Sequence, residues 1–333
     1  MNEDNESLSN DNNENNRNTS SYYAEDSEIF ANEDNYENIN GLNSMKILGI
    51  LNKEIEVEPH VIDIINIFKE YKAKSNDKLS EANIINLSPD SEFVKQIPLE
   101  IYKEFIESSE NYDKLIPNET RNFLMDFFSQ DLAQQQWTES IDNLNVHDYS
   151  ENITKIAINA FSLGHMNPLH NKETLEDSYL NDYIHPCLKS ALWNCANVYY
   201  TSGEITSPNH VNRQKGDGVG FATNSTKYQV VYVEGTRPYK VDDKKVIENQ
   251  NKLGKNLKNL YSEIIKERVT TRKRIMPDME VFGVSSVRRN IHMYIFGFFG
   301  EYYLREVDNA SVPRDYTEME EFIYFYEVIL KWA

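Results

Sequence analysis

The sequence predicts an α/β protein in which helices flank a mixed β-sheet, and three observations support this fold class. Helical and strand-like segments alternate from about residue 173 to the end of the chain. The period of the apolar residues changes from that of a helix to that of a strand and back. Residues 281–284 are apolar almost throughout, which is typical of a central strand covered on both faces. We therefore expect helices packed on both sides of one sheet.

The first helix of this part of the chain is expected at about residues 173–200. Its apolar side chains recur at helical spacing and form one stripe, made of Leu175, Tyr179, Tyr183, Ile184, Cys187, Leu188, Ala191, Leu192 and Cys195. Two strand-like segments, 219–222 and 228–233, follow this helix. The polar residues 223–226 between them predict a turn, so we expect the two strands to pair antiparallel.

A second helix is expected at about residues 243–268, with an inward face formed by Leu253, Leu257, Leu260, Tyr261 and Ile264. Three strand-like runs follow this helix, at residues 280–285, 291–296 and 302–307. An amphipathic helix at residues 316–332 closes the chain.

Two further regions are predicted before residue 166. Residues 1–43 are polar and acidic, with eleven acids and one arginine among the first 40. Such a segment buries too little apolar area to offset the entropy lost on ordering, so we expect a disordered tail. Residues 44–165 carry apolar side chains at helical spacing and predict a helical accessory region. A continuous extension of the domain at 166–333 is the alternative.

The charge of the chain is unevenly distributed. The formal net charge is −20, and the first 40 residues contribute half of it. Residues 201–310, in contrast, hold 18 lysines and arginines against 13 acids. The acidity of the whole chain therefore does not exclude a nucleic-acid ligand, which we would expect at this basic segment. Ordinary solvated helix faces would give the same excess.

The cysteines and the hydropathy predict an intracellular protein. Cys187 and Cys195 are the only cysteines, and their positions on one predicted helix exclude a disulfide between them. The sequence has no run of eighteen apolar residues and does not begin with an apolar signal segment. We expect a location in the nucleus or the cytoplasm and no membrane partner, while protein partners are left open.

Three acidic residues occupy structurally distinct places in the predicted domain. Glu176 lies at the start of the first helix, Asp217 lies between two glycines at the mouth of a strand, and Glu234 directly follows the apolar run 230–233. A hard divalent cation takes carboxylate oxygens and water as ligands. Together, Glu176, Asp217 and Glu234 therefore predict a Mg²⁺ site.

Each acid also has a structural explanation. An acid in the first turn of a helix is favoured by the helix dipole, which accounts for Glu176. Gly-Asp-Gly is a common turn sequence, which accounts for Asp217. Glu234 could pair with Arg237 or Lys215, which would offset the free-energy cost of burying its charge.

The joint pattern resembles the restriction-endonuclease-like PD-(D/E)XK superfamily, in which a helix acid, a strand Asp and a Glu-x-Lys motif ligate the metal. Residues 173–313 are also similar to a large uncharacterised protein family expanded in early-diverging fungi. The segments that carry this similarity are Glu176-Asp-Ser-Tyr179 with Pro186, Lys215-Gly-Asp217, Tyr228-Gln-Val-Val-Tyr232-Val-Glu234-Gly-Thr236-Arg237, and Asp242-Asp243 with Lys252-Leu253. The resemblance implies a restriction-endonuclease-like domain at 166–333 and metal-dependent nuclease chemistry.

One position departs from the superfamily motif. Thr236 stands where Glu-x-Lys has its lysine. In active members this lysine helps to orient or deprotonate the attacking water and stabilises charge on the phosphate. Lys215 and Lys252 are the candidates to replace it, because the guanidinium of Arg237 stays protonated.

Two functions remain after this departure. The first is Mg²⁺-dependent hydrolysis of the phosphodiesters of DNA or RNA, with Glu176, Asp217, Glu234, Lys215 and Lys252 as its residues. The second is a catalytically inactive interaction or regulatory scaffold that keeps the nuclease fold.

Overall fold

The computed structural model describes residues 57–108, 121–122, 125, 169, 171–195, 198–206, 215–223, 228–239, 242–271, 273, 275, 279–314 and 318–333. All of these residues belong to one unit, Leu42–Ala333. The predicted tail at 1–43 and most of 109–170 lie outside the described residues, as does most of the predicted turn at 223–226. No helix among the described segments is long and apolar enough to cross a membrane.

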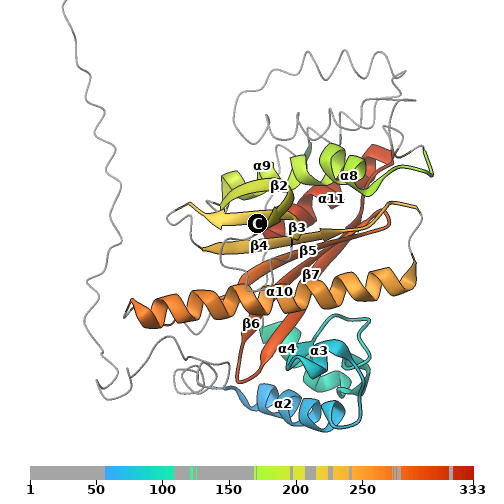
Figure 1. The fold of residues 1–333 in the computed structure, drawn as a ribbon. Coiled ribbons are helices and arrows are strands. Elements are labelled where there is room, and N and C mark those ends of the chain that lie inside the picture. Colours follow the sequence, from blue (N-terminus) through green and yellow to red (C-terminus); the bar gives the residue numbers. More distant parts are fainter. Residues whose placement is uncertain are drawn as a thin grey trace, which may run out of the picture. The chain divides into compact units, whose positions relative to one another are not determined.

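A seven-stranded mixed sheet forms the centre of the molecule, and helices flank it (Figure 1). This confirms the predicted α/β class. The strands lie in the order β1-β7-β6-β5-β4-β3-β2. Their bounds are β1 (Ile84–Asn86), β2 (Val198–Thr206), β3 (Lys215–Ala222), β4 (Gln229–Gly235), β5 (Val281–Val287), β6 (Asn290–Phe298) and β7 (Tyr302–Ser311).

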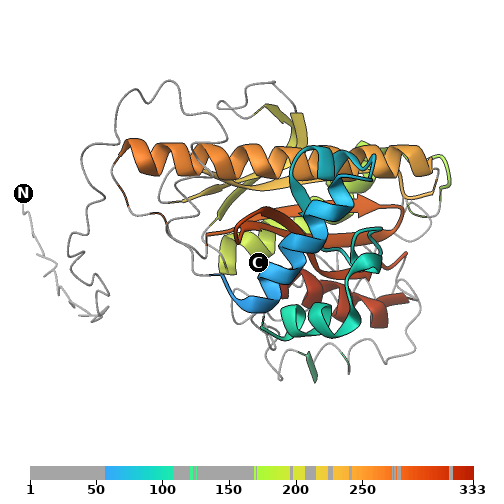
Figure 2. The same ribbon diagram turned by 90° about the horizontal axis from the view of Figure 1, so that it is seen from below.

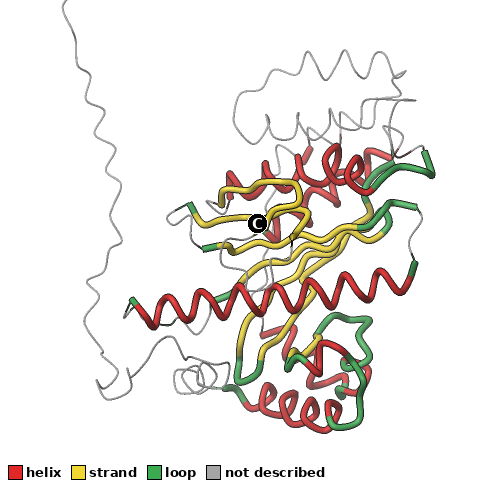
Figure 3. Tube along the Cα trace, viewed as in Figure 1, coloured by secondary structure: helices red, strands yellow, loops and turns green. Residues whose placement is uncertain are grey.

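Figure 3 shows the strands of this sheet in yellow, and two antiparallel blocks of them join at one parallel pair. Strands β2, β3 and β4 pair antiparallel, as do β5, β6 and β7. Strands β4 and β5 pair in parallel, and the long helix α10 (Asp243–Thr270) makes the crossover that a parallel pair requires. The predicted antiparallel pair at 219–222 and 228–233 is confirmed as β3 and β4.

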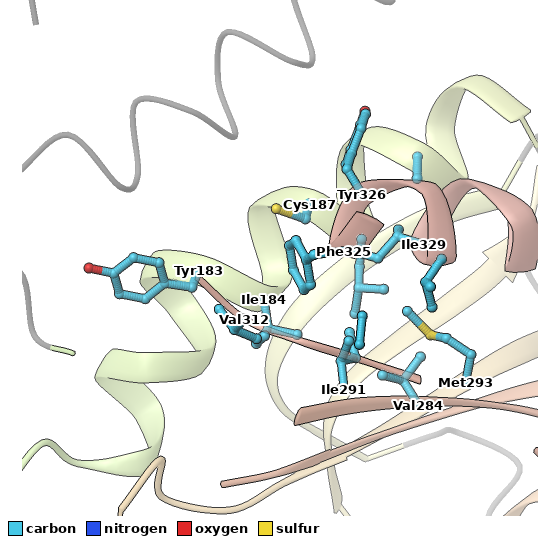
Figure 4. Packing of buried hydrophobic residues seen from close by; sticks show 14 of the residues in the cluster. Tyr183, Ile184, Cys187, Val284, Ile291, Met293, Val312, Phe325, Tyr326 and Ile329 are labelled. Atoms are coloured by element: carbon cyan, nitrogen blue, oxygen red, sulfur yellow. The ribbon is translucent and has the colours of Figure 1, made fainter. Parts of the chain in front are cut away.

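Helices cover both faces of the sheet (Figure 2). On one face, α8 (Glu176–Tyr179), a π-helical segment (Leu180–Ile184) and α9 (His185–Cys195) pack together with α11 (Met319–Trp332). Figure 4 shows side chains of this core, including Cys187, Val284 and Phe325. On the other face, α10 buries Leu253, Leu257 and Tyr261 against the sheet.

The described part of the predicted accessory region is helical but also contributes to the sheet. Its helices are α2 (Pro59–Lys72), α3 (Lys78–Glu81), a 3₁₀ turn (Val94–Gln96) and α4 (Leu99–Ser108). Strand β1, between α3 and the 3₁₀ turn, pairs in parallel with β7, with Ile84 opposite Tyr302. The sheet therefore extends across the predicted boundary at 165 and 166.

The sequence missed two strands, β1 and β2. Strand β1 has only three residues, too few to show a period. Strand β2 reads Val-Tyr-Tyr-Thr-Ser-Gly-Glu-Ile-Thr, without apolar alternation, and it contains an irregularity between Ser202 and Ile205. The predicted helix at 173–200 therefore ran into the first residues of β2.

Candidate functional site

The three predicted acids come from a helix start, a strand and a strand end. Glu176 is the first residue of α8, and Glu234 is the last residue but one of β4. Asp217 is the third residue of β3, so it lies within the strand rather than at its mouth. The three acids therefore lie on a helix and two strands in the order in which the sequence predicted these elements.

Asp217 and Glu234 are neighbours across two strands. In the antiparallel pair of β3 and β4, Gly218 lies opposite Val233. The next position in this register sets Asp217 opposite Glu234, and directly opposite residues point to the same face of a sheet. That face is the one covered by α10, since Val219 and Tyr232 pack in the core beneath it. Asp217 Oδ2 also accepts a hydrogen bond from the Gly235 amide at 2.7 Å.

Lys252 of α10 neutralises the buried carboxylate of Glu234. Its Nζ lies 2.7 Å from Glu234 Oε1 and donates a hydrogen bond to Oε2 at 2.9 Å. The same ammonium donates to the backbone carbonyl of Lys215 at 3.0 Å. The Tyr232 hydroxyl donates to this carbonyl too, also at 3.0 Å. A positive charge is thus fixed beside Glu234 although Thr236 supplies none.

The two lysines named by the sequence contribute in different ways. Lys252 brings its ammonium to Glu234, whereas the contact of Lys215 in this group is made by its backbone oxygen. The side chain of Lys215 is exposed at the start of β3, and that of Arg237 is also exposed. The structure pairs Glu234 with Lys252, whereas the structural explanation named Arg237 or Lys215.

Glu176 is held by a different lysine of α10. Its Oε2 lies 2.5 Å from Nζ of Lys245, so an ion pair joins the starts of α8 and α10. The charge of Glu176 also reaches Asp217, because it contributes to raising the pKa of that carboxyl. Glu176 therefore borders the pair formed by Asp217 and Glu234.

Burial is the largest cause of the raised pKa values of Asp217 and Glu234. It raises the pKa of Glu234 to about 7, against the opposing hydrogen bond and charge of Lys252. Burial also raises the pKa of Asp217, which the Gly235 amide opposes and the Glu176 charge reinforces. Paired carboxylates with raised pKa values beside a cation are common at functional sites, and they also occur in structural ion-pair networks.

Across the described segments, no three His, Cys, Asp or Glu side chains are arranged so that they could hold a metal ion. Each predicted ligand has a partner within the chain: Lys245 for Glu176, the Gly235 amide for Asp217 and Lys252 for Glu234. The Lys252 ammonium contacts both oxygens of the Glu234 carboxylate, Oε1 at 2.7 Å and Oε2 at 2.9 Å. The Mg²⁺ site stays a prediction.

Position 236, where the motif that the sequence resembles has a lysine, is buried and hydrogen-bonded in the structure. Thr236 is 1% exposed. Its hydroxyl donates to the Ser286 carbonyl at 3.1 Å and accepts from the Arg288 amide at 3.1 Å. These bonds connect the end of β4 to β5 and to the turn after β5. A charged side chain at position 236 would be buried and would lose both bonds.

Two residues of the site, Lys245 and Asn249, carried no sequence signal that singled them out. Lys245 and Asn249 lie on α10 and reach the site because the helix folds back over the sheet. Asn249 Nδ2 donates to the Gly235 carbonyl at 2.7 Å and so fixes α10 to the end of β4. Tyr232 belongs to a segment that carries the family similarity, but the sequence did not indicate that its hydroxyl donates to the carbonyl that holds Lys252.

Comparison of the chain with protein-family models, with curated proteins and with solved structures gives no match.

Substitutions at Thr236 test its structural role. Thr236→Val keeps the shape but removes both hydrogen bonds, so it should lower the free energy of unfolding by about 1–3 kcal/mol. Thr236→Lys should lower it further, because it also buries an unpaired charge. Urea denaturation measures both effects. Thr271→Val is the control: its hydroxyl bond to the Glu267 carbonyl is exposed, so water can replace the bond and stability should change little. A Thr236→Lys variant as stable as the natural protein would contradict this role.

The raised pKa of Glu234 predicts a pH-dependent effect of Glu234→Gln. Because the folded-state pKa of about 7 exceeds the ordinary value of 4.5, ionisation of Glu234 removes stability as the pH rises from 4.5 through 7. The glutamine variant lacks this loss. Its stability relative to the natural protein should therefore rise between pH 5 and pH 8, by about 3 kcal/mol at most. Denaturation at both pH values measures the change.

Glu248→Gln is the matched control, because Glu248 lies on α10 with an exposed side chain. Its stability difference from the natural protein should not change over this pH range. A difference for Glu234→Gln that is equally constant would show that burial does not raise the pKa of Glu234.

Proposed function

We propose that the protein is a metal-dependent phosphodiesterase of the restriction-endonuclease-like type that acts on nucleic acid. One observation carries the proposal: the ammonium of Lys252 lies 2.7 Å from the buried carboxylate of Glu234. Lys252 thereby takes the place of the motif lysine that Thr236 lacks. The origin of the three acids in a helix start, a strand and a strand end also supports this assignment.

The location of the site supports it as well. In α/β sheets, ligands bind beyond the carboxyl ends of parallel strands. Glu234 lies at this end of β4, which pairs in parallel with β5. Asp217 lies in the adjacent strand, and Glu176 lies on the helix that borders it.

The residues present fit a magnesium ion. Glu176, Asp217 and Glu234 offer carboxylate oxygens, the donors that this cation prefers. Glu234 is buried and its two oxygens contact the Lys252 ammonium at 2.7 Å and 2.9 Å, so a cation would share this carboxylate with Lys252. When bound, Mg²⁺ would lower the pKa of a water ligand and neutralise charge on the phosphate.

The chain's own residues have distinct roles in this proposal. The Lys215 carbonyl and Glu234 hold the ammonium of Lys252 in one position. From there Lys252 would orient the attacking water and stabilise the negative charge that develops on the phosphate. Tyr232 supports Lys252 indirectly, since burial raises the pKa of its hydroxyl and keeps it a donor to the Lys215 carbonyl.

The exposed cations around the site suit a polyanionic substrate. The side chains of Lys215 and Arg237 are exposed at the start of β3 and after the end of β4. They belong to the basic segment 201–310. Contacts of such residues with phosphates would make nucleic-acid affinity fall steeply with salt. These contacts are the same for DNA and RNA, so the substrate is proposed as a nucleic-acid phosphodiester.

A catalytically inactive interaction scaffold is the second candidate. It is favoured by the partners that the three acids already have within the chain, which leave no preformed metal site among the described residues. Such a protein would keep the ion pairs of Lys245 and Lys252 as permanent structural contacts.

Lys252→Gln tests the proposed function. We expect the natural protein to cleave DNA or RNA in the presence of Mg²⁺ or Mn²⁺, and the variant to lose about 100-fold or more in rate. Cleavage of labelled single-stranded DNA, duplex DNA and RNA measures this. Lys255→Gln is the matched control, because Lys255 is exposed one turn further along α10, and it should retain the activity.

Two outcomes would contradict the proposal. Cleavage by Lys252→Gln at the rate of the natural protein would remove Lys252 from the reaction. Failure of the natural protein both to cleave and to bind Mg²⁺ at millimolar concentration would favour the scaffold.

A further inference from the structure

Helix α10 supplies a cation to two of the three acids of the site. Lys245 pairs with Glu176 at 2.5 Å, and Lys252 pairs with Glu234 at 2.7 Å. Seven residues separate the two lysines, which is close to two helical turns. Their side chains therefore leave the same side of α10, about 10 Å apart along its axis.

The two ion pairs differ in their exposure to solvent. Glu234 is 3% exposed and needs Lys252 to compensate for its burial. Glu176 and Lys245 are 22% and 47% exposed, and ion pairs as exposed as this add little to stability. The Lys245 pair is therefore weak enough to be exchanged for a stronger partner of Glu176.

We propose that Lys245 is a built-in counter-ion of the candidate site. It occupies the carboxylate of Glu176 in the metal-free protein and is displaced when a divalent cation binds. The released ammonium then faces the phosphates of the substrate next to Lys252. This inference rests on the proposed function, because it takes Glu176 as a metal ligand.

The direction of the effect separates this role from a purely structural one. A cation that must displace Lys245 binds more weakly by the free energy of the displaced pair. Removal of Lys245 should then strengthen metal binding. If the ion pair instead only held Glu176 in place for the metal, removal of Lys245 should weaken metal binding.

The experiment is a calorimetric titration of the full chain with Mn²⁺ alone. Lys245→Gln should lower the dissociation constant for Mn²⁺ by about two- to fivefold relative to Lys244→Gln. Lys244 is the matched control because it is the adjacent residue and carries the same charge. It is 80% exposed, and it forms an ion pair with Glu248 at 3.8 Å. In a Glu176→Gln background, Lys245→Gln should have no further effect.

The possible outcomes separate this inference from the proposed function. Equal dissociation constants for Lys245→Gln and Lys244→Gln, or weaker binding by Lys245→Gln, would overturn the counter-ion role alone. If the natural protein binds no Mn²⁺, or binds it unchanged after Asp217→Asn and Glu234→Gln, the proposed function is overturned and this inference with it.

Discussion

The candidate site depends on the ion pair between Lys252 and the buried carboxylate of Glu234. A carboxylate that is 3% exposed is stable in its charged form only if a partner compensates for the lost hydration. Lys252 provides that compensation, and the Lys215 carbonyl holds its ammonium in place. Tyr232 and Asp217 are positioned around this pair by the register of β3 and β4.

The crossover helix α10 brings this pair together. A parallel connection from β4 to β5 requires the chain to return over the sheet, and α10 does so on the face to which Glu234 points. The bond from Asn249 to the Gly235 carbonyl fixes the helix at the end of β4. Helix α10 thus carries one cation to Glu234 and a second cation to Glu176. Position 236, where the motif would have its lysine, is held by the hydrogen bonds of Thr236. We propose that a lysine of this crossover helix, Lys252, takes the role that the motif gives to its own lysine.

Much of the fold could be predicted from the sequence, because long segments with a clear apolar period follow simple packing rules. The stripe of α10 and the apolar run of β5 are examples. Strands β1 and β2 could not be predicted, since one is very short and the other lacks alternation. Within the site, the placement of Glu234 at a strand end was apparent. The choice between Lys215 and Lys252 was not, because it depends on how α10 returns over the sheet, and the contact of Lys245 with Glu176 depends on the same path.

We propose above all that Asp217 and Glu234 hold a divalent cation with Lys252 beside it. The most direct measurement is a crystal structure of the protein with Mn²⁺, in which anomalous scattering locates the ion. We expect a Mn²⁺ ion bound by carboxylate oxygens of Asp217 and Glu234, with the Lys252 ammonium within hydrogen-bonding distance of Glu234. Mn²⁺ bound elsewhere, or Glu234 bound only to Lys252 in crystals saturated with the ion, would contradict it.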